Sequence, residues 1–184
     1  MDKYNNIYNF WFNTFNNPLK WLYCKKEYDN IIIANFSNDY INITQTIDTT
    51  DSMKCLINII ILDQFSRHIF RNNKNMYRMD NIARNIVLNN IGFLSDYNFY
   101  ESIYFLMPLN HSENIDDKDL LISYYNNLLE KFPEQSKRIE RFIKIILERK
   151  TVLSKFKRYP KRNIILKREP TNEEILYLNN NGKY

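Results

Sequence analysis

Apolar residues recur along most of the chain at intervals of three and four positions, the spacing that places them on one face of an α-helix. The strongest stripe comprises Met53, Leu56, Ile57, Ile60 and Ile61, and the polar run 49–52 before it offers side-chain oxygens to cap the helix start. The pattern therefore predicts an all-α fold, which we expect to hold about seven to eight helices.

Prolines and glycines set the expected limits of the other helices. We expect these helices to cover the following ranges: 7–12, 18–36, 79–87, 99–107, 116–128, 139–156 and 171–178. Pro18 suits a first helical turn, Pro108 should end the helix before it, and Gly92 suits a C-terminal turn. Asp116 or Asp117 should cap the helix that buries the following residues: Leu120, Leu121, Tyr124 and Leu128. Thr171 and Glu174 have the spacing of a capping box, in which the two side chains bond to each other's backbone amides.

Composition bounds the class of protein. The chain has 184 residues, of which 44% are apolar, enough for one good core, so we expect a single domain over 1–184 with a frayed tail at 179–184. Charged residues make up 26%, and the sequence contains no apolar run of the length that a membrane span needs. The start resembles no secretory signal, which predicts an intracellular, cytoplasmic protein, in a host cell if the source is viral. Cys24 and Cys55 are interpreted as buried or incidental thiols.

An acid, an amide and two arginines follow directly on the strongest apolar stripe. Asp63 and Arg67 stand four positions apart and would share a helix face, which Arg71 would join if the helix continued. One interpretation is an ion pair that locks this helix against a neighbour. The other is an anion site, in which Arg67 and Arg71 offer planar donors to a carboxylate or phosphate beside Asp63 and Gln64.

Several segments together resemble one family, the bacterial domain of unknown function 924. Phe10-Trp11-Phe12 resembles its opening F-W-F, and the segment 62–71 is similar to its L-D-Q-F-P-R-N-I-Y-R. The segment 108–113 is similar to P-L-E-H-S-E, 155–163 to R-F-G-R-F-P-H-R-N, and 171–174 to T-P-E-E. The resemblance covers nearly the whole chain and implies a TPR-like helical array, but it implies no activity.

The chain departs from that family pattern at several positions, of which five change the kind of side chain most. Ser66 replaces a proline and His68 an asparagine, Lys157 stands for a glycine, and Lys161 and Arg149 stand for histidines. If those histidines carry chemistry in relatives, this chain has lost part of it.

A histidine lies beside a carboxylate at His111-Ser112-Glu113. A histidine so placed can act as a general base near neutral pH, which makes His111 and Glu113 the candidate catalytic residues. The alternative is that both residues cap a helix and bond to backbone. Ser112 is a weak candidate nucleophile because no G-x-S-x-G turn surrounds it. With His68 as the other histidine and no cysteine cluster, no metal site and no cofactor are predicted.

The segment from Arg149 to Arg168 carries nine lysines and arginines and no acid, although the net charge of the whole chain is only +5. It is either a solvated basic face or a contact surface for RNA, DNA or an acidic protein. Arg158, Arg162 and Asn163 match the family motif and are expected to fold back toward Arg67 and His111.

These motifs lead to three hypotheses. The preferred one is a helical binding protein whose polar pocket takes an anionic small molecule or an acidic peptide. The predicted pocket residues are Asp63, Gln64, Arg67, Arg71, His111, Glu113, Arg158, Arg162 and Asn163. The alternatives are a hydrolase or transferase that uses His111 as general base, and nucleic-acid binding through 149–168. The oligomeric state is left open.

Overall fold

The computed structural model describes residues 2–23, 25–180 and 182–184, and every regular element within these ranges is helical. The all-α prediction is confirmed. Backbone contacts divide the chain into two compact units, residues 1–108 and 109–184. Each unit is described by itself, and the expectation of a single domain stays a prediction. None of the described helices is both long and apolar enough to cross a membrane.

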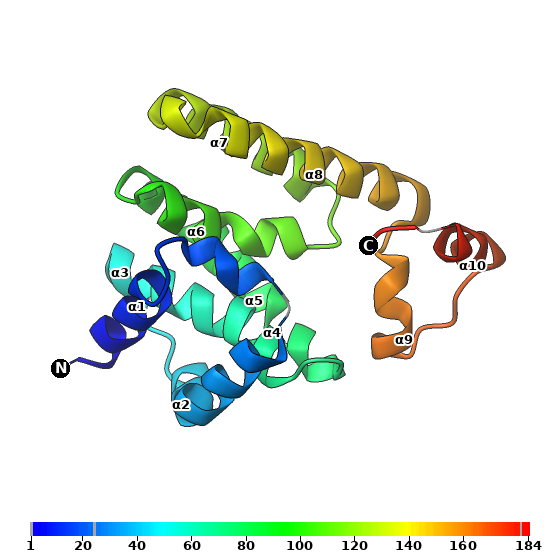
Figure 1. The fold of residues 1–184 in the computed structure, drawn as a ribbon. Helices are drawn as coiled ribbons and strands as arrows, with labels where there is room; N and C mark the ends of the chain where they lie inside the picture. Colours follow the sequence, from blue (N-terminus) through cyan, green and yellow to red (C-terminus); the bar gives the residue numbers. More distant parts are fainter. Residues whose placement is uncertain (1, 24, 181) are drawn as a thin grey trace. The chain divides into compact units, whose positions relative to one another are not determined.

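The first unit contains most of the helices (Figure 1). They are α1 (Lys3–Asn13), η1 (Pro18–Leu22), α2 (Lys26–Gln45), α3 (Ser52–Ile59), η2 (Ile60–Phe65), α4 (Ser66–Ile69), η3 (Lys74–Tyr77), α5 (Asp80–Asn89), η4 (Ile91–Ser95) and most of α6 (Phe99–His111). The segment η2 is a π-helix, whereas η1, η3 and η4 are 3₁₀ turns. Asp51 caps α3 by accepting a hydrogen bond from the Lys54 amide at 2.8 Å, as the polar run before this helix predicts.

The core of the first unit is built around two tryptophans. Trp11 and Trp21 stack with ring centroids 4.9 Å apart, and the Trp21 indole donates to the Trp11 carbonyl at 2.9 Å. The expected helix 18–36 is wrong, because η1 and α2 are separate and Tyr23 between them is extended. The separate 3₁₀ turn of η1 carries the Trp21 ring that stacks on Trp11.

The helical run α3–η2–α4 passes through the middle of this core. All residues from Cys55 to Ser66 are buried, so the run is enclosed on every side. The wide turn of η2 lies within it, a feature often found at functional sites. Met53, expected in the stripe, is instead exposed at the start of α3. Cys55 is buried, as expected, whereas Cys24 lies outside the described residues.

The second unit follows from the end of α6. It contains α7 (Asp116–Lys131), η5 (Pro133–Gln135), α8 (Ser136–Phe156), η6 (Pro160–Arg162), α9 (Asn163–Leu166) and α10 (Asn172–Asn179). The long helices α7 and α8 pack side by side (Figure 1). The capping box of Thr171 and Glu174 is confirmed at the start of α10. Beyond α10, the Tyr184 ring packs near Val152, Leu153 and Tyr159.

Three expected helix limits are wrong. Pro108 lies inside α6, which continues to His111, and neither Asp116 nor Asp117 caps α7, because Ile115 is the residue before its first turn. Gly92 lies inside η4 rather than at a left-handed helix end, since no glycine among the described residues has a positive φ. In α7, Tyr125 rather than Tyr124 is fully buried.

Candidate anion-binding site

The predicted site residues fall in both units. Asp63, Gln64, Arg67 and Arg71 belong to the first unit. His111, Glu113, Arg158, Arg162 and Asn163 belong to the second. One pocket shared by all of these residues would need side chains from both units, and it stays a prediction. Within each unit, however, the contacts of these side chains are defined.

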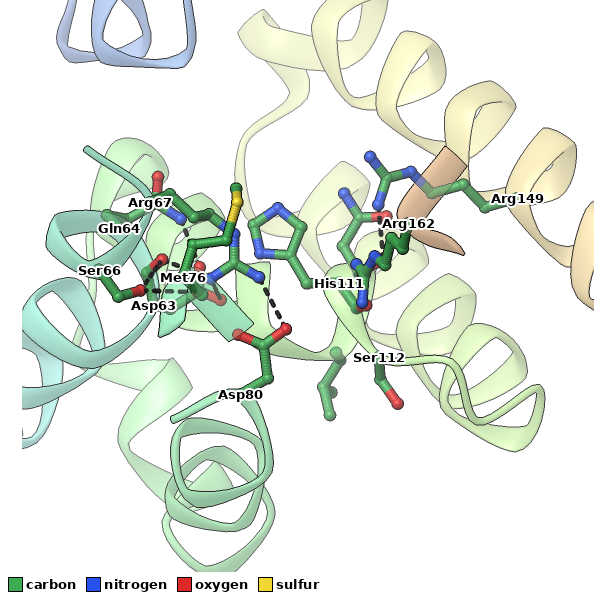
Figure 2. Close-up of polar contacts among 12 residues, drawn as sticks. Asp63, Gln64, Ser66, Arg67, Met76, Asp80, His111, Ser112, Arg149 and Arg162 are labelled. Carbon is green, nitrogen blue, oxygen red and sulfur yellow. Dashed lines mark hydrogen bonds and ion pairs between the residues drawn. The ribbon is translucent and has the colours of Figure 1, made fainter. Parts of the chain in front are cut away.

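Arg67 is held between two aspartates in the first unit (Figure 2). Its guanidinium lies 2.9 Å from the fully buried carboxylate of Asp63 and 2.9 Å from that of Asp80, the first residue of α5. It also donates to the Asp63 backbone carbonyl at 2.5 Å, and the Gln64 amide donates to the Asp63 carboxylate. These contacts favour the interpretation of an ion pair that locks the helix.

Arg71 lies beyond the end of α4, which stops at Ile69. It binds Asp29 of α2 through two nitrogens, at 2.5 and 2.6 Å, and His68 Nδ1 lies 2.8 Å from the same carboxylate. Burial raises the pKa of Asp29, but the hydrogen bonds from Arg71 and His68 outweigh it and leave this pKa below its ordinary value. Burial lowers the pKa of His68 more than Asp29 raises it. This triad ties α4 to α2.

The second unit gathers cations at the C-terminal end of α6. The fully buried Lys118 ammonium donates to three carbonyls, those of Leu109 at 2.5 Å, Asn110 at 3.0 Å and Ser112 at 2.8 Å. A lysine ammonium has three protons, and these carbonyls account for all of them. Lys118 therefore satisfies a helix end that would otherwise hold bare carbonyls.

Two arginines add to the same helix end (Figure 2). Arg149 of α8 donates to the Asn110 carbonyl at 2.8 Å, and Arg162 of η6 donates to the His111 carbonyl at 2.7 Å. We call Lys118, Arg149 and Arg162 the cation cluster. Cations are favoured where the helix dipole is negative, which explains why α6 continues beyond Pro108.

The cation cluster surrounds one buried aromatic ring, that of Tyr159. The charged groups of Arg162, Arg149 and Lys118 lie 4.8, 5.7 and 5.9 Å from its centroid. Burial raises the pKa of Tyr159 to about 12, although the two arginines oppose the shift. Tyr159 is 2% exposed, and neither its hydroxyl nor the Arg149 Nε has a hydrogen-bond partner of acceptable geometry among the described residues. The Arg149 side chain nevertheless lies close enough to the Tyr159 hydroxyl to lower the pKa of Tyr159 through a hydrogen bond, so these two buried polar groups are neighbours.

Glu113 binds the backbone of Tyr159 and the side chain of Arg168. One carboxylate oxygen accepts from the Tyr159 amide at 2.8 Å, and Arg168 donates to both oxygens at 2.8 and 3.1 Å. Burial raises the pKa of Glu113, but Arg168 and the Tyr159 amide lower it further, so the net shift is downward. A carboxylate held in this way is poorly placed to orient His111, so these contacts do not favour His111 and Glu113 as a catalytic pair.

The remaining predicted residues hold the C-terminal helices together. Arg158 binds Glu174 of the capping box through two nitrogens, at 2.6 and 2.7 Å. Asn163 accepts from Arg168 at 3.0 Å. His111 is half-buried as the last residue of α6, and the Ser112 hydroxyl accepts from the Asn114 amide at 3.0 Å, as in a local turn. Within the described ranges, no group of histidine, cysteine and acidic side chains could hold a metal ion.

Sequence reasoning missed several of the residues that complete these clusters. They are Asp29 and Asp80 in the first unit, and Lys118, Tyr159 and Arg168 in the second. Most of them lie far along the chain from their partners, so no local spacing signals them, and Lys118 binds backbone carbonyls, which leave no pattern in the sequence. The exception is Tyr159, which lies within the quoted segment 155–163.

Comparisons with known proteins show a family and leave the activity open. The family model "Bacterial protein of unknown function (DUF924)" matches residues 7–182. The fold is similar to the solved structure of a protein of unknown function, ATU0120 from Agrobacterium tumefaciens, with a TM-score of 0.81 and 26% sequence identity. The similarity covers 96% of this chain and 97% of that chain. A search of curated proteins finds no match.

Proposed function

The chain belongs to the DUF924 family of bacterial proteins of unknown function, and we propose that its second unit binds a small anion with a carboxylate or phosphate group. The proposed binding residues are Arg149, Arg162 and Tyr159, beside His111. The observation that carries the proposal is that three cations, Lys118, Arg149 and Arg162, gather around the buried Tyr159 ring.

An anionic oxygen is the group that three neighbouring cations would attract most strongly. Charge-assisted hydrogen bonds from a guanidinium to a carboxylate or phosphate are about twice as strong as neutral ones. Lys118 would add positive potential without contacting the ligand, because its three protons are directed at the carbonyls of Leu109, Asn110 and Ser112. Arg149, Arg162 and His111 are half-buried, so a ligand can reach them from solvent.

The test is isothermal titration and thermal shift with phosphate, pyrophosphate, acetate and citrate at low ionic strength. We expect at least one of these anions to stabilise the protein, by about 2.7 kcal/mol at a concentration one hundred times its Kd. Tyr159→Phe keeps the ring and removes the donor, and Arg149→Gln removes a guanidinium. Each should weaken binding about tenfold, as expected for the loss of about 1.4 kcal/mol.

The matched control is Arg141→Gln, which makes the same change at an exposed position of α8. It should leave the affinity unchanged. The proposal fails if no anion stabilises the protein, or if Tyr159→Phe and Arg141→Gln bind the anion equally well.

A further inference from the structure

The segment 182–184, which we call the tail, lies against the cation cluster. The Arg149 guanidinium lies 4.7 Å from the centroid of the Tyr184 ring and 5.7 Å from that of Tyr159. The two tyrosine rings are themselves neighbours, with centroids 6.2 Å apart. Tyr184 is half-buried in this position, so its ring covers Arg149 on the side that Tyr159 leaves open.

Two hydrogen bonds fix how Tyr184 lies on Arg149. The Tyr184 hydroxyl donates to the Glu148 carboxylate at 3.3 Å, and the Tyr184 carbonyl accepts from the Lys161 amide at 2.9 Å. Burial raises the pKa of Tyr184, although Arg149 opposes the shift, so the hydroxyl keeps the proton that it donates. Tyr184 therefore makes three different contacts: its ring with a guanidinium, its hydroxyl with a carboxylate, and its carbonyl with an amide.

The polar contacts that fasten the tail are weak or strained. The Lys183 ammonium lies 3.7 Å from Glu148, but the Lys183 side chain is 70% exposed, and an ion pair in water contributes little to stability. Tyr184 has a φ of 72°, in the left-handed region that residues other than glycine seldom adopt. The Tyr184 ring is therefore a cover that costs little to lift.

A free acid of similar shape would make stronger contacts at the same positions. The Lys161 amide now binds a neutral carbonyl, whereas a carboxylate there would accept a charge-assisted hydrogen bond and would lie next to Arg162 of η6. An aromatic ring would keep the cation–π contact with Arg149. A hydroxyl at the far end of that ring would donate to Glu148, which would otherwise repel an anion.

We infer that Tyr184 occupies the place of the ligand, and that the ligand is a small carboxylic acid with a para-hydroxyphenyl ring. The ring would lie on Arg149, the hydroxyl would donate to Glu148, and the carboxylate would accept from the Lys161 amide. This inference rests on the proposed anion site, of which it names the class of ligand and the cover. Inorganic phosphate has no ring to replace that of Tyr184.

The test is isothermal titration with para-hydroxyphenylacetate, phenylacetate, cyclohexylacetate and acetate at low ionic strength. The hydroxylated acid should bind about tenfold more tightly than phenylacetate, the change expected from one hydrogen bond to a charged group. Phenylacetate should bind about threefold more tightly than cyclohexylacetate, because a saturated ring has no π face for the guanidinium. Acetate should bind most weakly.

Variants of Tyr184 test whether its ring competes with the ligand. Tyr184→Ala should bind para-hydroxyphenylacetate at least about threefold more tightly than the wild type, because a closed cover lowers the fraction of molecules that can bind. Tyr184→Phe keeps the ring but not the bond to Glu148, so its gain should be smaller. The matched control is Tyr124→Ala, at a half-buried tyrosine of α7, which should leave the affinity unchanged. Thermal melts show whether each variant is folded.

The acceptor of the ligand hydroxyl is tested separately. Glu148→Ala should abolish the preference for para-hydroxyphenylacetate over phenylacetate. Glu140→Ala, the same change at an exposed position of α8, should keep the preference.

Proteolysis reports the movement of the cover without any substitution. When the ligand lifts the tail, the bond after Lys183 becomes a better substrate for trypsin. Early in the digestion, saturating para-hydroxyphenylacetate should speed cleavage after Lys183 at least about threefold, as followed by mass spectrometry. Cleavage after Lys144, an exposed lysine of α8, should not become faster.

Three results would overturn the inference: the four acids bind alike, Tyr184→Ala binds the hydroxylated acid no more tightly than Tyr124→Ala does, or the ligand leaves cleavage after Lys183 unchanged. Phosphate or acetate binding that is weakened by Arg149→Gln would in that case still support the proposed anion site. If no anion of either panel binds, the proposed site and this inference are both wrong.

Discussion

Replacing Lys118 by methionine tests how much the buried ammonium contributes to stability. Methionine has a similar length and is apolar, so the change removes the charge with little change of volume. The carbonyls of Leu109, Asn110 and Ser112 would lose this donor, although Asn110 would keep its bond to Arg149.

The size of the effect follows from two opposing terms. A hydrogen bond to a charged group contributes about 1.5–3 kcal/mol, so losing it at Leu109 and Ser112 costs about 3–6 kcal/mol. Removing a buried charge returns part of its desolvation cost, which is itself several kcal/mol. We therefore expect a net loss of about 3 kcal/mol, equivalent to a fall in Tm of about 6–12 °C for a chain of this length.

Urea unfolding followed by circular dichroism measures this loss directly, provided that the m-value is unchanged. The control is Lys150→Met, because Lys150 pairs with Asp119 at the surface, where an ion pair contributes about 0–1 kcal/mol. If Lys118→Met costs no more than Lys150→Met, the ammonium does not stabilise the end of α6, and our explanation for the continuation of this helix past Pro108 is incorrect.

Three further predictions concern pH, backbone strain and close packing. The pKa of His68 is lowered in the folded state, so as pH falls below about 6.5 the unfolded chain takes up a proton before the folded protein does. The free energy of unfolding should therefore decrease below this pH. Urea unfolding measured from pH 7 to 5 should show that this free energy depends less steeply on pH in His68→Asn than in the wild type. Lys157→Gly should raise stability by about 0.5–1 kcal/mol, because glycine adopts a positive φ without strain. The control Lys155→Gly, inside α8, should lower stability by about 1 kcal/mol. If thermal melts show that both variants change Tm in the same direction, this reasoning is wrong. A Cβ at Gly182 would lie 2.5 Å from the Tyr177 ring and its carbonyl, so Gly182→Ala should lower Tm by several degrees, and an unchanged Tm would contradict this packing.

Local patterns in the sequence predicted most of the helices, but not the division of 18–36 into two elements or the limit at Pro108. The stripe after Asp51, the capping box of Thr171 and Glu174, and the long helix α8 were all predicted from residues within one or two turns of each other. The prediction that the helix ends at Pro108 was wrong, because a proline ring removes only one backbone donor. The cations that bind the carbonyls of the next turn come from α7, α8 and η6, outside the sequence pattern of α6 itself.

The candidate site was harder to predict, because its pairings span long sequence separations. His68 binds an aspartate 39 residues away, and Arg168 binds a glutamate 55 residues away. Lys118 has an ordinary surface-like position in an acidic stretch, yet it is fully buried. Its burial depends on where the end of α6 lies, which no local spacing in the sequence specifies.

The enclosed run from Cys55 to Ser66 has a consequence for how the protein tolerates change. A typical amphipathic helix accepts substitutions on its outer face, so a saturation mutagenesis profile rises and falls with each turn. Here the profile should instead form a continuous trough with no helical period, whereas α8, which has one buried face, should show the usual oscillation. Viable variants would then carry almost no substitutions along this stretch.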